Sequence, residues 1–557
     1  MKSLLLSLIV FSGVSQAATD RSQFSWGAME KLAIQERGRV KPLQTFAEES
    51  VQFVTGSRSF NHLKAIETVF SWLLEYEDQW EKTEFVRVSY GPLKVKLGLP
   101  QDKKYFSPQS IRSNEALRAM MREIGAKQQR REKLEDMESK LVNLQAQVGV
   151  VDAIVSGQAL TIFPSPQGLE ANWIGLDGLS DPSRLPYSGP QKEKTEALLK
   201  MLFKAFVGGD AATWNANVGQ FTDWVRSDLS RGHYPSDAEM GREVHFNELR
   251  PFRWAWVIYV VAFIALLVAI QTKNVWATRI GAGILGAGIL LHIYGFVLRC
   301  WISGRPPVTN MYESVIWVSL GCLVFSIFIW AAYRNIVIPT AASVFSIVAL
   351  VLADNLPTVL DPGIQPLEPV LRSNFWLTTH VLCITLSYAA FALSLCIGNV
   401  VIGNYIFHPK KTAWIQTLSL YMYRAMQIGV ILVAGGTILG GVWADYSWGR
   451  FWGWDPKEVW ALIVLLMYVA VLHGRFAGWL KGFGFVSATI FCFLSVLMAW
   501  YGVNFVLGVG LHSYGFGSGG LSYVMMYVAA QVAFVLAGYI SHRKSGVASG
   551  QIFPSGR

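Results

Sequence analysis

The second half of the chain is a series of hydrophobic segments, each close to the length that crosses a bilayer. A helix of about 20 apolar residues spans the roughly 30 Å of hydrocarbon. Backbone polar groups inside lipid must bond within the chain, so such a series favours a bundle of helices. The sequence predicts nine spans, at 254–272, 280–300, 311–333, 336–353, 377–406, 425–444, 457–474, 483–505 and 521–541.

The composition agrees with a membrane protein that also has a polar part. Of the 557 residues, 52% are hydrophobic and only 15% are charged. The net charge of +10 does not indicate nucleic acid, because the basic residues of the second half lie mainly in short loops between spans, where they set orientation. The expected surroundings are therefore membrane lipid, with no nucleic-acid partner. The five cysteines form no CxxC pair, so neither a thiol relay nor a disulfide framework is predicted.

The amino-terminal part is predicted to be exported. Residues 1–17 have Lys2, a short apolar run and small residues before a cleavage point after Ala17, which is the pattern of a signal peptide. Residues 18–250 are polar and are expected to form an exported, α-rich soluble domain. Within it, good helix formers predict one long helix from Ser113 to Val148.

An exported domain makes the first span run inward and places five basic loops on the cytoplasmic side. The fold class is thus a mostly α, polytopic helical membrane bundle, residues 251–545, followed by a cytoplasmic tail, 546–557. A signal peptide and this topology fit a multi-pass protein of the bacterial inner (cytoplasmic) membrane whose soluble domain faces the periplasm. The loops 301–310, 354–376, 445–456 and 506–520 are then on the outer side.

An unusual aromatic segment, WGRFWGWDPKE, occupies residues 448–458. Tryptophans often form belts at a membrane interface, but Trp448, Trp452 and Trp454 are denser than a belt requires. They could form a platform for a flat, half-polar molecule. Asp455 and Pro456 also suit the start of the seventh helix, as cap and first-turn residue.

Two histidines are expected at the same outer surface as this segment. His380 begins the fifth span and His512 follows the eighth. A lone histidine at the end of a span is usually solvated or hydrogen-bonded, but imidazole is also a common axial ligand of haem iron. Convergence with the aromatic segment favours haem.

For two further histidines, both a functional and a structural interpretation are open. His473 ends the seventh span near the cytoplasmic face, where it is either a functional group or an interfacial residue beside Arg475. His292 lies deeper in the second span and more simply forms a hydrogen bond to a neighbouring helix. Gly436 and Gly440 are interpreted as sites of close helix packing.

At these residues the chain resembles the CcsA or ResC-type cytochrome c biogenesis proteins of the system II pathway, which belong to the WWD-motif haem-handling proteins. The resemblance covers most of 254–541. It rests on five segments: WGRFWGWDPKE, FWLTTHVLCITLSYAAF around His380, MYVAVLHGR around His473, VNFVLGVGLHSYGF around His512, and RCWISGRPPVTNMYES at 299–314.

The resemblance implies covalent attachment of haem b, through two thioethers, to the CxxCH segment of an apocytochrome c. It also implies that His380 and His512 are the two outer haem ligands. The segment from Trp448 to Asp455 would be the platform, and His473 would belong to an inner haem site. Four spans of a CcsB half do not appear ahead of residue 254, so a separate CcsB (ResB)-like membrane subunit is the expected partner, supplying the second inner ligand unless His292 does.

Two other functions compete with a role in a holocytochrome c synthase. The first is a haem exporter or chaperone without ligation activity. The second is an electron-transfer cytochrome b, which is disfavoured because His380 and His512 lie at the ends of spans. From charge and proximity, Arg450 or Lys457 could pair with haem propionates.

Overall fold

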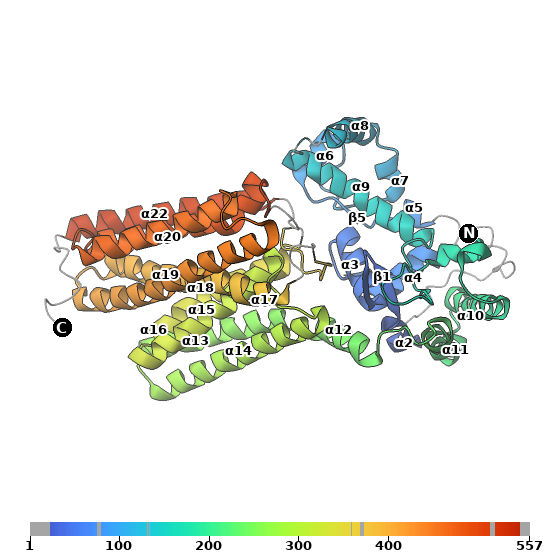
Figure 1. The fold of residues 1–557 in the computed structure, drawn as a ribbon, viewed down its shortest axis with the longest axis horizontal. Coiled ribbons are helices and arrows are strands. Elements are labelled where there is room, and N and C mark those ends of the chain that lie inside the picture. The colour runs from blue at the N-terminus through green and yellow to red at the C-terminus, as the bar shows by residue number, and fades with distance from the viewer. Residues whose placement is uncertain are drawn as a thin grey trace. The chain divides into compact units, whose positions relative to one another are not determined.

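The computed structural model describes residues 23–74, 79–130, 132, 134–357, 359–367, 373–512 and 519–545. It contains two compact units, Met1–Leu249 (unit 1) and Arg250–Arg557 (unit 2) (Figure 1). The expected signal peptide and the expected cytoplasmic tail lie outside the described residues. That unit 1 is exported stays a prediction.

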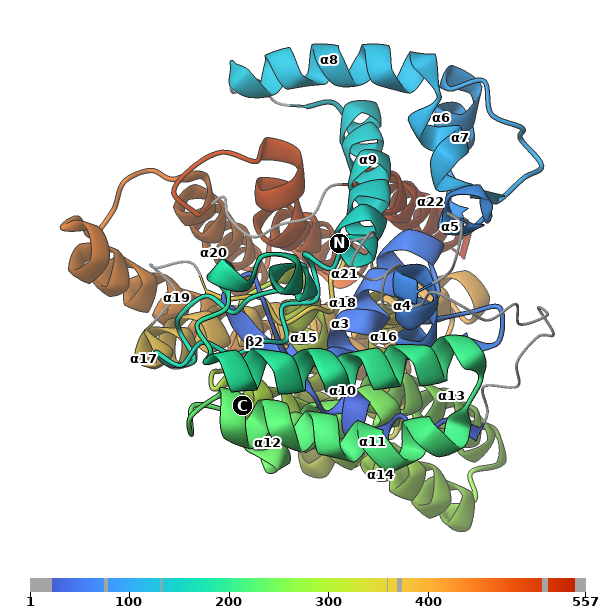
Figure 2. The same ribbon diagram turned by 90° about the vertical axis from the view of Figure 1, so that its right-hand side faces the viewer.

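Unit 1 is α-rich, and its described residues form three small two-stranded antiparallel sheets, β1–β2, β3–β4 and β5–β6. Its core is strongly aromatic: Trp26 and Trp214 pack with ring centroids 4.8 Å apart, and Phe70 and Phe206 join them. The long helices α10 and α11 lie side by side (Figure 2). The elements are α2 (Gly27–Glu30), β1 (Ala33–Glu36), β2 (Arg39–Pro42), α3 (Leu43–Thr55), β3 (Ser59–Phe60), β4 (Leu63–Lys64), α4 (Ala65–Leu74), α5 (Gln79–Lys82), β5 (Val86–Arg87), α6 (Gly91–Lys96), β6 (Tyr105–Phe106), α7 (Pro108–Arg112), α8 (Glu115–Gln129), α9 (Asp136–Val155), η3 (Leu176–Ser180), η4 (Pro182–Arg184), α10 (Gly189–Gly208), α11 (Ala211–Trp224), η5 (Val225–Leu229) and α12 (Asp237–Leu249).

The single helix predicted from Ser113 to Val148 is wrong, because α8 and α9 are separate helices. Glu135 caps α9 and forms a capping box with Glu138, whose carboxylate accepts the Glu135 backbone N–H at 2.9 Å. Acidic side chains that favour helix interiors by composition can also begin a new helix in this way. A prediction from helix propensity alone therefore joins α8 and α9 into one helix.

Unit 2 is a bundle of long apolar helices. The nine predicted spans are confirmed, since the described residues contain nine helices long and apolar enough to cross a membrane, the first of them ending at Thr272. The helices of unit 2 are α13 (Pro251–Thr272), α14 (Val275–Ser303), α15 (Met311–Tyr333), α16 (Val337–Asn355), α17 (Asn374–Trp376), η7 (Leu377–Val381), α18 (Leu382–Phe407), α19 (Thr412–Trp448), α20 (Pro456–Phe476), α21 (Gly482–Leu497), η8 (Met498–Leu507) and α22 (Leu521–Ser545).

Helix α18 is the centre of this bundle. It packs against α15, α16, α19, α21 and α22. Its Phe391 stacks on Tyr468 of α20 with ring centroids 3.7 Å apart. The predicted close packing of Gly436 is confirmed, because a Cβ there would lie 3.1 Å from Ile384 of α18. Such small residues let two helix backbones approach closely.

Two of the spans contain π-helical segments, η7 before α18 and η8 after α21. A π-helix has one extra residue in its turn, so it changes the direction of the side chains that precede it relative to those that follow. His380 lies within η7, and the chain reaches His512 five residues after η8 ends at Leu507.

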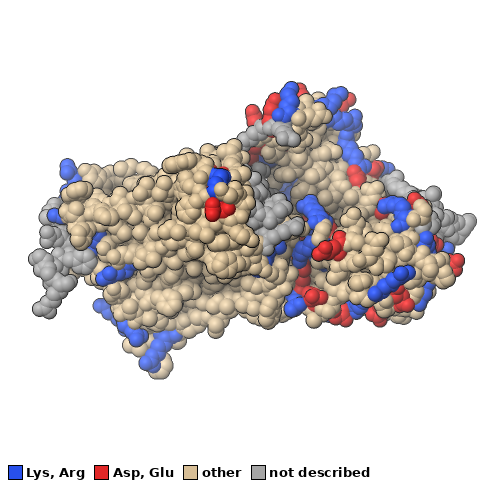
Figure 3. Space-filling model, in the orientation of Figure 1, with Lys and Arg blue, Asp and Glu red and all other residues tan. Residues whose placement is uncertain are grey.

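The surface of unit 2 has the charge distribution of a membrane-embedded bundle. Figure 3 shows its side almost free of charged residues, while Lys and Arg gather toward the end where α22 finishes. The basic residues of the loops predicted to be cytoplasmic are Lys273, Arg279, Arg334, Lys410, Lys411, Arg424, Arg475, Lys481, Arg543 and Lys544.

Candidate functional site

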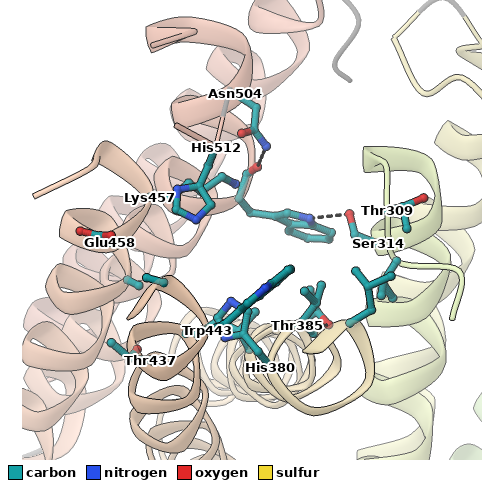
Figure 4. Close-up of a pocket in the computed structure, with 18 of the residues that line it drawn as sticks. Thr309, Ser314, His380, Thr385, Thr437, Trp443, Lys457, Glu458, Asn504 and His512 are labelled. Atoms are coloured by element: carbon teal, nitrogen blue, oxygen red, sulfur yellow. Dashed lines mark hydrogen bonds between the residues drawn. The ribbon is translucent and has the colours of Figure 1, made fainter. Parts of the chain in front are cut away.

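The helix ends at the other end of unit 2 enclose a pocket, here called the histidine pocket (Figure 4). The empty space between its walls is about 1230 Å³, including the part that opens to solvent. The walls are formed by Val308, Thr309, Asn310, Met311, Ser314, Leu377, His380, Val381, Ile384, Thr385, Tyr388, Thr437, Gly440, Gly441, Trp443, Ala444, Trp448, Trp452, Lys457, Glu458, Ala461, Trp500, Asn504 and His512.

His380 is held in the pocket by helix α19. Its Nδ1 lies 2.8 Å from the carbonyl oxygen of Gly436, and its ring meets the edge of Trp443 at a centroid distance of 5.7 Å. Gly440 leaves the space for this ring, since a Cβ there would lie 2.5 Å from His380 Cε1. The predicted close packing of Gly440 is thus confirmed, and the group it accommodates is an imidazole.

His512 is held by Asp455, the N-cap residue of α20. Its Nδ1 lies 2.8 Å from Oδ2 of Asp455, and its ring meets Trp448 edge to face at 5.4 Å. The His512 side chain is 27% exposed, whereas that of Asp455 is 3% exposed. The carboxylate is therefore a buried support behind a more accessible imidazole.

Asp455 performs two tasks at once. It caps α20 by accepting the Lys457 backbone N–H at 3.0 Å, with Pro456 at the first helical position, as predicted. It also accepts the Leu511 backbone N–H at 2.6 Å, which fixes the chain beside His512. Burial raises the pKa of Asp455, but the hydrogen bond and charge of His512 and the two backbone N–H groups outweigh burial, so this pKa lies below its ordinary value.

Both imidazoles therefore use the same ring nitrogen to bond the protein. When Nδ1 donates its proton to a carbonyl or carboxylate oxygen, Nε2 of the neutral ring is left with a lone pair. Metal-ligating histidines usually have this second bond, which fixes the tautomer and the ring orientation. The residues present thus fit an iron porphyrin, with two imidazoles and aromatic walls in one pocket.

The predicted aromatic platform is divided by the fold. Trp448, the last residue of α19, and Trp452 line the pocket. Trp454 is 72% exposed, and its ring meets the edge of Trp452 at 6.0 Å. It has a positive φ of 58°, which is unfavourable for an aromatic residue. The structure brings together His380, His512, Trp448 and Trp452, and leaves Trp454 outside the pocket.

Several pocket residues were missed by sequence reasoning. Nothing in the sequence separates Trp443 and Trp500 from the tryptophans of an interfacial belt, yet both line the pocket. Trp500 donates its indole N–H to Ser314 Oγ at 2.9 Å and so joins η8 to α15. The signal that could have found Trp443 is its spacing, since it lies one helical turn after Gly440, on the face that holds His380.

The two cations considered for a carboxylated ligand are placed differently. Lys457 lines the pocket, and its Nζ donates to the carbonyl oxygen of Ala499 at 3.1 Å. Arg450 is not among the lining residues, and its guanidinium lies 6.0 Å from the Trp448 ring centroid.

His473 is not part of this pocket. It lies near the other end of α20, and at 1.5 Å per residue it is roughly 24 Å along the helix from Lys457. It is exposed on the helix surface, and its Nδ1 lies 2.8 Å from the Val469 carbonyl oxygen one turn back. Its Nε2 is therefore available on the outside of unit 2.

His292 is completely buried between α13 and α14. Its Nδ1 lies 3.1 Å from the hydroxyl of Tyr259, and its ring meets the edge of Phe252 at 5.3 Å. The simpler prediction, a hydrogen bond to a neighbouring helix, is confirmed.

Comparison with known proteins supports the family resemblance that these residues indicate. The family described as "Cytochrome C assembly protein" matches residues 308–512. This range begins at the first pocket residue, Val308, and ends at the last, His512.

Two kinds of relative are similar to the chain over different lengths. "Cytochrome c biogenesis protein CcsA" of Prochlorococcus marinus is 33% identical over 303 residues, which cover 46% of this chain and 93% of the relative. The protein of the same name from a Synechococcus strain is 32% identical over 302 residues, 48% of this chain and 98% of the relative. "Protein NrfI" of Wolinella succinogenes is 28% identical over 547 residues, 92% of this chain, and the chain spans 58% of its length.

The CcsA proteins are covered almost completely, and the family match coincides with the histidine pocket. The chain therefore belongs to the CcsA-like family of cytochrome c biogenesis proteins.

Proposed function

We propose that the histidine pocket binds haem b, and that His380 and His512 would hold its iron. The single observation that carries this proposal is the matched bonding of the rings, each with Nδ1 on a protein oxygen at 2.8 Å. One imidazole comes from η7 and the other from the loop after η8, and both line one pocket, which suits two ligands of a single haem iron.

The walls fit the remainder of such a ligand. Trp443, Trp448, Trp452 and Trp500 provide flat apolar surface, which a porphyrin ring buries favourably. Lys457 is the cation among the lining residues that would pair with a propionate, and Arg450, beside Trp448, is the second choice.

The proposed activity is a contribution to covalent attachment of haem to an exported apocytochrome c. Bound haem supplies two vinyl groups, with which the two thiols of a CxxCH segment form thioethers. The residues of this chain act by position: the imidazoles fix the iron, the tryptophans fix the ring, and the open side admits the peptide. Holding two reactants in a productive orientation replaces a rare encounter with an oriented one.

The proposal extends to a second subunit. His473 is exposed on unit 2 and uses only its Nδ1 for a bond within the helix. It is therefore suited to ligate a haem iron together with a residue of another membrane protein. An ionisable group on a lipid-facing helix surface is costly unless it has a partner. A CcsB-like subunit would supply this partner, in a bacterial inner membrane with the histidine pocket on the periplasmic side.

The first experiment is the absorption spectrum of the detergent-purified protein, oxidised and reduced. Wild type is compared with His380→Ala, His512→Ala and the double variant, each with and without imidazole. We expect a low-spin haem spectrum that each single variant weakens and that imidazole restores. Identical spectra for all four proteins would show that haem is not held by these two side chains.

A second experiment separates a synthase component from a haem exporter. The chain is coexpressed with a CcsB-like subunit in a host that lacks every other cytochrome c maturation system. Covalent haem on a reporter cytochrome, detected by haem stain after denaturing electrophoresis, supports the synthase role. Haem bound by the protein but no stained reporter supports the exporter.

A further inference from the structure

Arg299 and Glu313 form an ion pair that is almost completely withdrawn from solvent. Their side chains are 1% and 0% exposed, and Arg299 Nε lies 2.9 Å from Glu313 Oε1. Arg299 lies near the end of α14, and Glu313 lies in the first turn of α15. Removing two charges from water often costs as much as their attraction returns, so a gain in stability does not by itself explain such a pair.

The carboxylate of Glu313 fixes the residues that enter α15. Its Oε2 accepts two hydrogen bonds from Thr309, one from the backbone N–H and one from Oγ1, each 2.7 Å long. Asn310 caps the same helix, with its Oδ1 accepting the Glu313 backbone N–H at 2.8 Å. The two residues before α15 are thus held by charged or capping hydrogen bonds.

The guanidinium of Arg299 fixes a distant segment against the same point. Its Nη1 donates to the Pro362 carbonyl oxygen at 2.9 Å, and its Nη2 lies 3.4 Å from that of Gly363. The Asn310 amide also reaches the Gly363 carbonyl oxygen, at 3.4 Å. One ion pair therefore joins α14, α15 and the segment after α16.

The residues held in this way form one wall of the histidine pocket. Thr309, Asn310, Met311 and Ser314 line the pocket, whereas Arg299 and Glu313 lie behind them and do not line it. Figure 4 shows Thr309 and Ser314 on the opposite side of the pocket from Glu458 and Lys457. The position of this wall decides the width of the pocket.

We propose that Arg299 and Glu313 are positioning residues of the haem site. The ion pair holds the α15 wall at a fixed distance from the wall formed by α19 and α20, and thereby sets how tightly the pocket closes on its ligand. This inference rests on the proposed function, since it takes haem as that ligand.

The test is the double variant Arg299→Met/Glu313→Leu. Apolar side chains of similar size often replace a buried ion pair without loss of stability, so the bundle is expected to unfold at a similar temperature. The hydrogen bonds to Thr309, Pro362 and Gly363 are lost, however. Supporting residues of this kind typically change metal affinity by about 10–100-fold, so we expect about tenfold weaker haem retention.

A matched control is available in the same unit. Arg253 and Asp354 form an ion pair between α13 and α16, 2.8 Å long, with side chains 41% and 17% exposed. Neither residue lines the pocket. The variant Arg253→Met/Asp354→Leu should therefore keep the wild-type haem spectrum and the wild-type retention of haem against added apomyoglobin as a haem acceptor.

Each outcome decides the inference. Weaker retention in the first variant with an unchanged unfolding temperature and an unaffected control supports it. Wild-type retention in the first variant, or equal loss in the control, overturns it. If the first variant does not fold, Thr309→Val removes only the Oγ1 hydrogen bond to Glu313. Reduced haem retention in this variant supports the inference, and unchanged retention overturns it. If the wild-type protein binds no haem, the proposed function is wrong, and this inference is wrong with it.

Discussion

A single hydrogen bond decides what each imidazole of the pocket can do. Sequence placed His380 and His512 at one surface, but it did not reveal which ring nitrogen would face a ligand. The Gly436 carbonyl oxygen and the Asp455 carboxylate decide this by occupying Nδ1. The sequence cannot single out this backbone carbonyl, because every residue has one. Only the register of η7 against α19 selects it.

Gly440 provides a sharp test of the His380 position. Gly440→Ala adds a Cβ 2.5 Å from the imidazole, so the ring must move away from the Gly436 carbonyl oxygen. We expect about 10–100-fold weaker haem retention, as for loss of a bond that orients a ligand. The matched control is Gly435→Ala on the same helix, where an added Cβ meets nothing within 4 Å. Equal retention in both variants, measured by spectral titration, would contradict this account.

The lowered pKa of Asp455 predicts how the stability of the fold depends on pH. Its pKa in the folded protein lies below the ordinary value of 3.8, so its ionised form stabilises the fold. That contribution is complete above about pH 4 and is lost as the pH falls through the lowered pKa. The difference in thermal unfolding temperature between wild type and Asp455→Asn should therefore be constant above pH 4 and shrink below it.

The control for this experiment is Asp445→Asn, at an exposed position near the end of α19. It should unfold like the wild type across the whole pH range. A gap between wild type and Asp455→Asn that does not shrink at any pH below 4 would mean that the carboxylate is not the source of the effect.

Among the elements, the π-helical segments are what sequence periodicity could not predict. Length and hydropathy sufficed for the nine spans, and the Asp455-Pro456 pair correctly predicted the start of α20. A π-turn adds one residue without changing the overall length or hydropathy of a span appreciably, so neither criterion detects it. Trp443 and Trp500 were missed for a related reason, since a buried tryptophan and an interfacial one look alike in sequence.

The segment η7 can be tested by removing its extra residue. Deletion of Val381 joins His380 directly to α18 in regular α geometry, which rotates the histidine by about 100°. We expect the loss of the His380 contact with Gly436 and a spectrum like that of His380→Ala. Val381→Ala retains the length of the segment and should keep the bis-histidine spectrum. A deletion variant with the wild-type spectrum would show that η7 does not direct His380.

In the whole molecule, the two kinds of relative match the chain over different lengths. The CcsA proteins match 46–48% of the chain, whereas the NrfI alignment covers 92%, a share that unit 2 alone cannot reach. The histidine pocket is built entirely from unit 2. Unit 1 contributes none of the residues that line the pocket, and it has a buried aromatic core of its own.

The orientation of the bundle is tested with the two ends of α19. Lys411 precedes this helix and Ser447 lies in its last turn. In a cysteine-free background, Ser447→Cys should react with a membrane-impermeant maleimide added outside the inner membrane. Lys411→Cys should react only after the membrane is permeabilised, because basic loops remain in the cytoplasm. The reverse labelling pattern would invert the proposed topology.

The Nδ1 bonds of His380 and His512 also determine whether protons are released when a metal binds. A neutral imidazole whose proton is already on Nδ1 presents a lone pair at Nε2, so forming a bond to iron there displaces no proton. Thiolate ligands, by contrast, must each release one when metal binds. As long as both rings are neutral, loading and unloading of the pocket involve no proton exchange at its ligands. In the proposed function, an incoming histidine of another chain would then replace one imidazole by another, with no proton released.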